Sequence, residues 1–340
     1  MKLLPVLAAV LALTSLTPAA HASGADCSLT TLPVSGPTGT ATVSGQLCTP
    51  AGANPDTIQL LVHGGTYNRA YWDLPGVPES YSYQRTMARA GRATFAVDRL
   101  GTGASAHPLS LPMLISVEAR SMHDVVQHLR AGRVGGTAYR KVVIVGHSVG
   151  SGIVAAEAAT YRDVDGVVLS GMTHMPAVPV LALGAALGLQ PAFLDDVLAR
   201  LGSDPLYFTT RPGARAGLFY AMNDAEQAVV NADEATKDQV SVPGMGTVAV
   251  FGIVLPTTLG INVPVFQAVG SDDVLFCGLL ALRDCSSANS LRAQEAPYYA
   301  PEAQLQTYVL PGAGHSLGLH RNAEEYRAAT RAWLSAKFGM

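Results

Sequence analysis

The chain has 340 residues, of which 49% are hydrophobic and 14% charged, and its formal net charge is −3. This composition excludes a disordered or collagen-like polymer and provides enough apolar side chains for the core of an enzyme-sized globular domain. The sequence has no cluster of basic residues that could follow a row of phosphates, so nucleic acid is not an expected partner.

The first 22 residues have the organisation of a secretory signal peptide. Lys2 gives a positive start, residues 3–16 are apolar, and residues 20–22 are Ala-His-Ala, which fits a small-x-small cleavage site. The apolar stretch is short for a bilayer span, and no basic stop-transfer segment follows it. We therefore expect a secreted, extracellular protein that is cleaved near Ala22 and keeps no membrane anchor.

The four cysteines all follow this segment, and disulfides form in the oxidising surroundings of an exported protein. Cys27, Cys48, Cys277 and Cys285 allow three pairings. Nearness in sequence favours one bond between Cys27 and Cys48 and another between Cys277 and Cys285. A zinc site is not expected, because no cysteine pair has C-x-x-C spacing and no histidine follows at ligand spacing.

Strands and helices are expected to alternate along most of the chain. Residues 40–48 alternate in polarity and predict an edge strand of an antiparallel pair. Short apolar runs predict buried strands at 57–62, 93–97, 142–145, 166–169, 264–269 and 304–310. Helical spacing predicts helices at 81–90, 113–129 and 323–338. This alternation predicts an α/β fold in which helices flank a mostly parallel central sheet.

Residues 172–262 break the alternation. The segment is rich in Ala and Leu, is nearly uncharged over 181–189, and shows helical spacing at 193–201 and 225–235. An insertion of this length between two strands predicts a helical cap on a single domain that spans residues 23–340. The alternative is that some of these helices belong to the ordinary outer layer of the fold.

A nucleophile motif lies between the strand at 142–145 and a helix of small residues. Residues 146–150 are Gly-His-Ser-Val-Gly, the pattern GxSxG at a sharp strand-to-helix turn. Such a turn strains the backbone of Ser148 and packs helix against strand, which leaves no room for side chains at Gly146 and Gly150. The free N–H groups of the helix N-terminus favour the negative charge that develops in acyl transfer. Ser148 is therefore the candidate nucleophile.

Residues 63–66, His-Gly-Gly-Thr, directly follow the strand at 57–62. Two glycines after a buried strand let the backbone approach another group, and beside a nucleophile that group is most simply a substrate oxyanion. A plain tight turn is the alternative. His63 and His147 flank these reactive positions and are expected to be structural.

A serine nucleophile needs a base, and the base needs an acid to orient it. Asp272 and Asp273 follow the strand at 264–269, and His315 follows the strand at 304–310. All of these candidates stand at the carboxyl ends of strands, where ligands bind in open α/β sheets. Their order along the chain is serine, acid, histidine.

From residue 57 to the C-terminus the chain resembles the α/β-hydrolase superfamily, particularly its exported bacterial esterases and lipase-like members. The motifs that carry the resemblance are GHSVG at 146–150, HGG at 63–65 and GAGHSL at 312–317. The order serine, acid, histidine is also that of the superfamily's triad.

The resemblance implies a role for several residues. Ser148 would be the nucleophile and His315 the general base, and Asp273 would be the acid because the family acid usually stands three residues after the strand-end glycine. The implied oxyanion hole consists of the backbone N–H of Val149 with that of Gly65 or Thr66. Some esterases have a third glycine where this chain has Thr66, which leaves the second amide of the hole open.

The expected activity is hydrolysis of carboxylic esters through an acyl-enzyme intermediate, with no metal or organic cofactor. The expected partner is a small-molecule ester with apolar acyl or alkyl groups, lactones included, because residues 172–262 are so apolar. The alternatives are a cofactor-free perhydrolase or a peptidase on the same triad, and a non-catalytic binding protein on a hydrolase scaffold. The complete set of triad residues argues against the binding protein.

Overall fold

The computed structural model describes residues 24–202, 204–255 and 257–339, so the expected signal peptide at 1–22 lies outside the described residues. The strands are β1 (Ala25–Gly36), β2 (Gly39–Pro50), β3 (Thr57–Val62), β4 (Ala93–Val97), β5 (Lys141–His147), β6 (Gly166–Ser170), β7 (Leu189–Pro191), β8 (Tyr207–Thr210), β9 (Val240–Ser241), β10 (Val265–Gly270) and β11 (Gln306–Leu310). The α-helices are α1 (Tyr83–Arg89), α2 (Ile115–Arg130), α3 (Val149–Tyr161), α4 (Val178–Leu183), α5 (Ala214–Phe219), α6 (Gln227–Ala235), α7 (Val242–Thr247), α8 (Ala288–Glu295) and α9 (Ala323–Phe338). Short 3₁₀ and π helices are η1 (Arg69–Trp72), η2 (Glu79–Tyr81), η3 (Gly184–Gly188), η4 (Ala192–Leu194), η5 (Leu198–Leu201), η6 (Val248–Val254), η7 (Thr257–Gly260), η8 (Leu279–Ala281), η9 (Ala296–Tyr298), η10 (Pro301–Ala303) and η11 (Leu317–Leu319).

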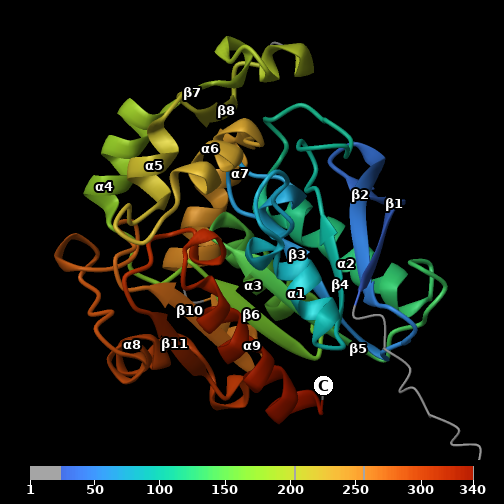
Figure 1. Ribbon diagram of the computed structural model, residues 1–340. Helices are drawn as coiled ribbons and strands as arrows, with labels where there is room; N and C mark the ends of the chain where they lie inside the picture. Colours follow the sequence, from blue (N-terminus) through green and yellow to red (C-terminus); the bar gives the residue numbers. More distant parts are fainter. Residues whose placement is uncertain (1–23, 203, 256, 340) are drawn as a thin grey trace, which may run out of the picture.

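One eight-stranded sheet organises the molecule, with the strand order β1-β2-β4-β3-β5-β6-β10-β11 (Figure 1). The six strands from β4 to β11 in this order pair in parallel, whereas β2 pairs antiparallel with β4 and β1 antiparallel with β2. The predicted mostly parallel α/β sheet is confirmed, and every strand predicted for it lies within two residues of its observed bounds.

The inner strands β4, β3, β5, β6 and β10 of the central sheet contribute apolar side chains to both faces, because successive residues point in opposite directions. In β3, Leu60 and Val62 belong to the core shared with α2 and α3, whereas Leu61 belongs to the core shared with α1 and α9. Figure 1 shows α1 and α9 in front of the sheet and α2 and α3 behind it. Burial on both faces explains why these strands are continuous apolar runs.

The sequence does not predict β1. Only two of its twelve residues are buried, so the strand lacks the apolar pattern of a core strand, and it is held by pairing along its whole length with β2. Cys27 lies directly opposite Cys48 in this pair, and a disulfide joins them. A second disulfide joins Cys277 to Cys285. Both predicted pairings are confirmed.

The chain between β6 and β10 differs from the predicted helical insertion in two ways. It contains a small antiparallel sheet, in the order β7-β8-β9, and residues 193–201 form η4 and η5 instead of one helix. The uncharged run at 181–189 ends α4 and forms η3, and its Leu183 and Leu187 side chains are 60% and 67% exposed. None of the described helices of the protein is long and apolar enough to cross a membrane.

Candidate active site

Ser148 lies at the turn between β5 and α3 and has a positive φ, which a residue with a side chain rarely adopts, with φ 54° and ψ −121°. A side chain on either flanking glycine would collide with backbone. A Cβ on Gly150 would lie 2.4 Å from the carbonyl oxygen of Val62, and one on Gly146 would lie 2.5 Å from Cα of Ser151. The glycines therefore allow a strained, partly exposed serine at the N-terminus of α3, as the sequence predicts.

The loop after β3 packs directly on this turn. A Cβ on Gly64 would lie 3.1 Å from Cβ of Ser148, and one on Gly65 would lie 3.2 Å from Cγ2 of Val149. The backbone N–H groups of Val149, Gly65 and Thr66 donate no hydrogen bond to any other described residue. These three unpaired N–H groups belong to the turn at Ser148 and to the loop packed on it, so they are the candidates for holding an oxyanion.

His315 and Asp273 form a buried pair. Nδ1 of His315 lies 2.9 Å from Oδ2 of Asp273, and the two side chains are 1% and 0% exposed. The other carboxylate oxygen of Asp273 accepts a hydrogen bond from the amide of Leu275, 2.9 Å away. Asp272 is exposed and contacts the hydroxyl of Ser271. The structure thus brings His315 together with Asp273 and not with Asp272.

Ser148 and His315 lie on adjacent loops. The amide of Ser148 donates to the carbonyl of Ser170 over 2.8 Å, and a Cβ on the next residue, Gly171, would lie 3.2 Å from Cε1 of His315. The rings of His147 and His315 have centroids 5.0 Å apart. No hydrogen bond joins the Ser148 hydroxyl to His315 among the described residues, and such catalytic contacts often tighten only when substrate binds.

His63 and His147 are buried beside these groups. His63 Nδ1 lies 2.9 Å from the carbonyl oxygen of Gly64, and its Nε2 accepts a hydrogen bond from the amide of Arg99 over 3.1 Å. The ring of His147 stacks on Tyr71 with centroids 4.4 Å apart. Burial lowers the pKa of both histidines well below the usual range, so both rings stay neutral and hold structure, as expected.

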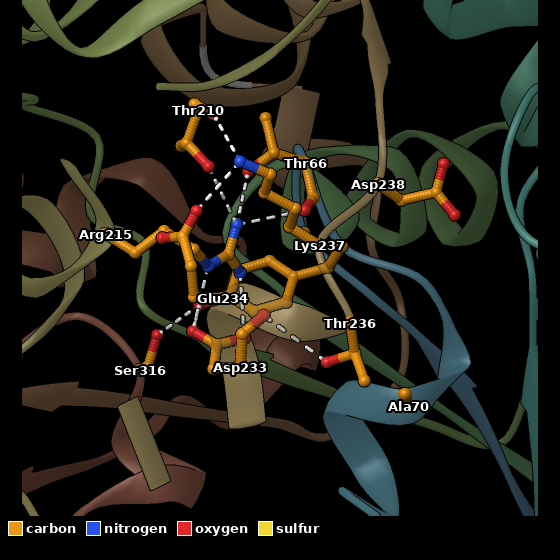
Figure 2. Close-up of polar contacts among 12 residues, drawn as sticks. Thr66, Ala70, Thr210, Arg215, Asp233, Glu234, Thr236, Lys237, Asp238 and Ser316 are labelled. Carbon is orange, nitrogen blue, oxygen red and sulfur yellow. Dashed lines mark hydrogen bonds and ion pairs between the residues drawn. The ribbon is translucent and has the colours of Figure 1, made fainter. Parts of the chain in front are cut away.

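A buried ionic network from the 172–262 segment reaches the same loops (Figure 2). Nε and Nη2 of Arg215 on α5 lie 3.0 and 2.9 Å from the two carboxylate oxygens of Asp233 on α6. Nη1 of Arg215 donates to both the carbonyl and the hydroxyl oxygen of Thr66, each at 3.1 Å. Arg215 and Asp233 are 0% and 1% exposed, so this pair fixes Thr66 from within the core.

The network continues from Asp233 toward the histidine loop. The hydroxyl of Tyr220 donates to Asp233 over 2.7 Å, and the hydroxyl of Tyr67 lies 2.7 Å from that of Ser316, the residue after His315. Arg215 lies over the Tyr67 ring at 4.0 Å. Sequence reasoning missed Arg215 and Asp233, because no motif surrounds them and their partners are distant in the sequence.

Replacing Arg215 with methionine is expected to lower the free energy of unfolding by about 3–5 kcal/mol, because the carboxylate of Asp233 remains buried without a cation. Adding Asp233→Asn removes that charge and keeps an acceptor for Tyr220, so the double variant should recover most of the loss in urea denaturation. Its turnover of an ester substrate should stay low, because the Thr66 carbonyl is still unsupported. Full turnover in the double variant would contradict a role of Arg215 in positioning the loop.

Comparison with solved structures shows the same fold in several hydrolases. A thermophilic esterase from Thermogutta terrifontis is 18% identical with a TM-score of 0.58, and the match covers 90% of this chain and 98% of that one. An esterase from Exiguobacterium antarcticum is 14% identical with a TM-score of 0.62, over 89% and 98% of the two chains. The enol-lactonase from Burkholderia xenovorans LB400 is 15% identical with a TM-score of 0.59, over 87% and 97%.

No curated protein sequence matches the chain. Residues 59–329 match the alpha/beta hydrolase family, a range that includes the turn at Ser148, the loop at 63–66 and the pair of Asp273 and His315. The match extends over most of the chain, and the strand order and parallel sheet agree with it. The chain therefore belongs to the alpha/beta hydrolase family.

Proposed function

We propose that the protein is an exported serine hydrolase that cleaves carboxylic esters through an acyl-enzyme intermediate. The observation that carries the proposal is the strained Ser148 at the N-terminus of α3, beside the hydrogen-bonded pair of His315 and Asp273. Membership of a hydrolase family supports hydrolysis, and the structural neighbours, which include two esterases and an enol-lactonase, favour ester or lactone substrates.

In the proposed mechanism the buried carboxylate of Asp273 accepts the Nδ1–H of His315, which leaves Nε2 free to take a proton. His315 removes the hydroxyl proton of Ser148 as the oxygen attacks the ester carbonyl. The N–H groups of Val149 and of Gly65 or Thr66 then hold the oxyanion, and each such donor is typically worth about 10²–10³ in kcat. His315 returns the proton to the leaving alcohol. In the second half of the reaction His315 takes a proton from water, which attacks the acyl-enzyme, and then returns that proton to the oxygen of Ser148 as the acid leaves.

Two aromatic rings beside His315 favour substrates with apolar groups. The ring of Phe219, from the 172–262 segment, and the ring of Phe276, beside Cys277, lie 5.6 and 5.7 Å from the ring of His315. We take the 172–262 segment to be a cap on a single domain, since Phe219 and Arg215 bring it to the catalytic loops. The two disulfides support export to an oxidising compartment.

A panel of p-nitrophenyl esters of increasing acyl length tests the proposed function. We expect hydrolysis of the panel, with a preference for acyl chains longer than acetate because aromatic rings flank the base. Steady-state kinetics of the purified protein, measured without added metal, give kcat/KM for each ester. Failure of a folded protein to hydrolyse any ester or lactone would contradict the proposal and favour a binding protein.

The value of kcat/KM should rise with pH on the acidic side of the profile, because His315 accepts a proton only when neutral. Burial lowers the pKa of His63 and His147 well below the usual histidine value of about 6.5, so these two rings are already neutral and should add no further step. The measurement is kcat/KM for one p-nitrophenyl ester from pH 5 to pH 8. A flat profile over this range would count against a histidine base.

A further inference from the structure

A second cluster of ionisable side chains lies around Glu157 of α3, about 14 Å along the helix axis from Ser148. His123 on α2, Glu157 on α3 and Asp163 in the turn before β6 each place one potential ligand atom within 4.8 Å of the others. Nδ1 of His123 lies 2.8 Å from Oδ2 of Asp163, and the ring of Tyr161 stacks on the imidazole with centroids 4.1 Å apart. No sequence motif indicates this cluster, because its members are up to 40 residues apart.

Glu157 is the anomaly in this cluster. It is 0% exposed, and neither of its carboxylate oxygens accepts a hydrogen bond from a described N–H or O–H group. Its one polar neighbour at hydrogen-bond range is a second carboxyl group, that of Asp163. Oδ1 of Asp163 is also buried without a partner. Buried polar groups in native proteins are nearly always satisfied, and a lone buried carboxylate is strongly unfavourable, so these oxygens require a cation or a proton.

Arg130, the cation beside the cluster, is already engaged elsewhere. Its Nε and Nη2 donate to the backbone carbonyl of Asp163 over 3.1 and 2.6 Å, and its Nη2 also lies 2.8 Å from a carboxylate oxygen of Asp165. It leaves the oxygens of Glu157 without a hydrogen bond.

We propose that His123, Glu157 and Asp163 bind one divalent transition-metal ion, for which Zn²⁺ is the probe. The donor set is one imidazole nitrogen with two carboxylate oxygens, and zinc commonly takes both kinds of ligand. Calcium and magnesium prefer oxygen ligands alone, so they fit the imidazole poorly. The side chains of His123 and Asp163 are 26% and 18% exposed, which gives an ion access to the buried Glu157 from one side.

The site would connect α3 to its neighbours. The ion would join α2, the last half of α3 and the turn that leads into β6, at positions far from the catalytic loops. Its expected effect is therefore on stability, and the inference does not depend on the proposed ester hydrolysis. A free metal ion stabilises whichever state binds it, so the melting temperature reports on the site directly.

Isothermal titration calorimetry and thermal unfolding of the metal-depleted protein test the proposal with ZnCl₂ and with CaCl₂. The wild type is expected to bind one Zn²⁺ per chain and to melt about 5 °C higher at a hundredfold excess over the Kd. Glu157→Gln and His123→Asn should each weaken Zn²⁺ binding by about tenfold or more. The matched control is Glu302→Gln, because Glu302 is an exposed acid on η10 and should leave binding unchanged.

Three results would contradict the proposal. If Zn²⁺ neither binds nor raises the melting temperature of the wild type, Glu157 holds only a proton. If Zn²⁺ binds the wild type and both site variants equally, the ion sits elsewhere on the protein. Should Glu157→Gln fail to fold, His123→Asn decides alone, because His123 is partly exposed. Equal stabilisation by Ca²⁺ would contradict the transition-metal assignment.

Discussion

Replacing Ser148 with alanine is expected to lower kcat for an ester substrate by about 10⁴-fold or more, the loss usual for a triad nucleophile. The change removes one hydroxyl from a partly exposed position, and that hydroxyl donates no hydrogen bond within the described part of the chain. The fold should therefore be unaffected. Steady-state kinetics with a p-nitrophenyl ester measures the loss, and circular dichroism with a urea titration measures the fold.

The control is Ser286→Ala, because Ser286 is an exposed serine next to Cys285 and away from the candidate catalytic groups. It should keep wild-type turnover. If Ser148→Ala keeps a tenth of wild-type turnover, Ser148 is not the nucleophile.

The second large loss of turnover is expected on replacing Asp273, the candidate acid. Asp273→Asn should lower kcat by about 10⁴-fold, because an amide in place of the carboxylate favours the wrong tautomer of His315 and no longer stabilises its protonated form. The asparagine can still accept the hydrogen bond from the amide of Leu275, so the loop should keep its conformation. The measurement is kcat for both proteins under conditions in which circular dichroism shows them folded.

The neighbouring aspartate provides the matched control. Asp272→Asn changes an exposed side chain whose contact is the hydroxyl of Ser271, so turnover should stay near the wild-type value. A large loss in Asp272→Asn together with a small loss in Asp273→Asn would reverse the assignment of the acid.

The central sheet could be predicted from the sequence because its strands are buried on both faces and so form uninterrupted apolar runs. The turn at Ser148 could be predicted because GxSxG needs small residues where the backbone of α3 meets that of β3, and Gly150 has no space for a Cβ. β1 could not be predicted, because pairing with β2 holds it and its own residues show little apolar pattern.

The polar networks could not be predicted because they depend on contacts between distant segments. Arg215 binds Thr66, which is 149 residues earlier, and no local spacing encodes that contact. The β7-β8-β9 sheet was missed because strands of two to four residues carry no readable period. Glu157 is the single acid in an otherwise apolar helix, and because a buried acid is rare unless it is partnered, the sequence alone marks this position as unusual.

Labelling with a fluorophosphonate probe tests the central claim most directly, because the probe reacts only with an activated serine. Peptide mapping by mass spectrometry after incubation of the purified protein should show a single adduct on Ser148. The adduct should be absent in Ser148→Ala and form much more slowly in Asp273→Asn. A folded protein that takes up no label, or takes it up on a different serine, would contradict Ser148 as the nucleophile.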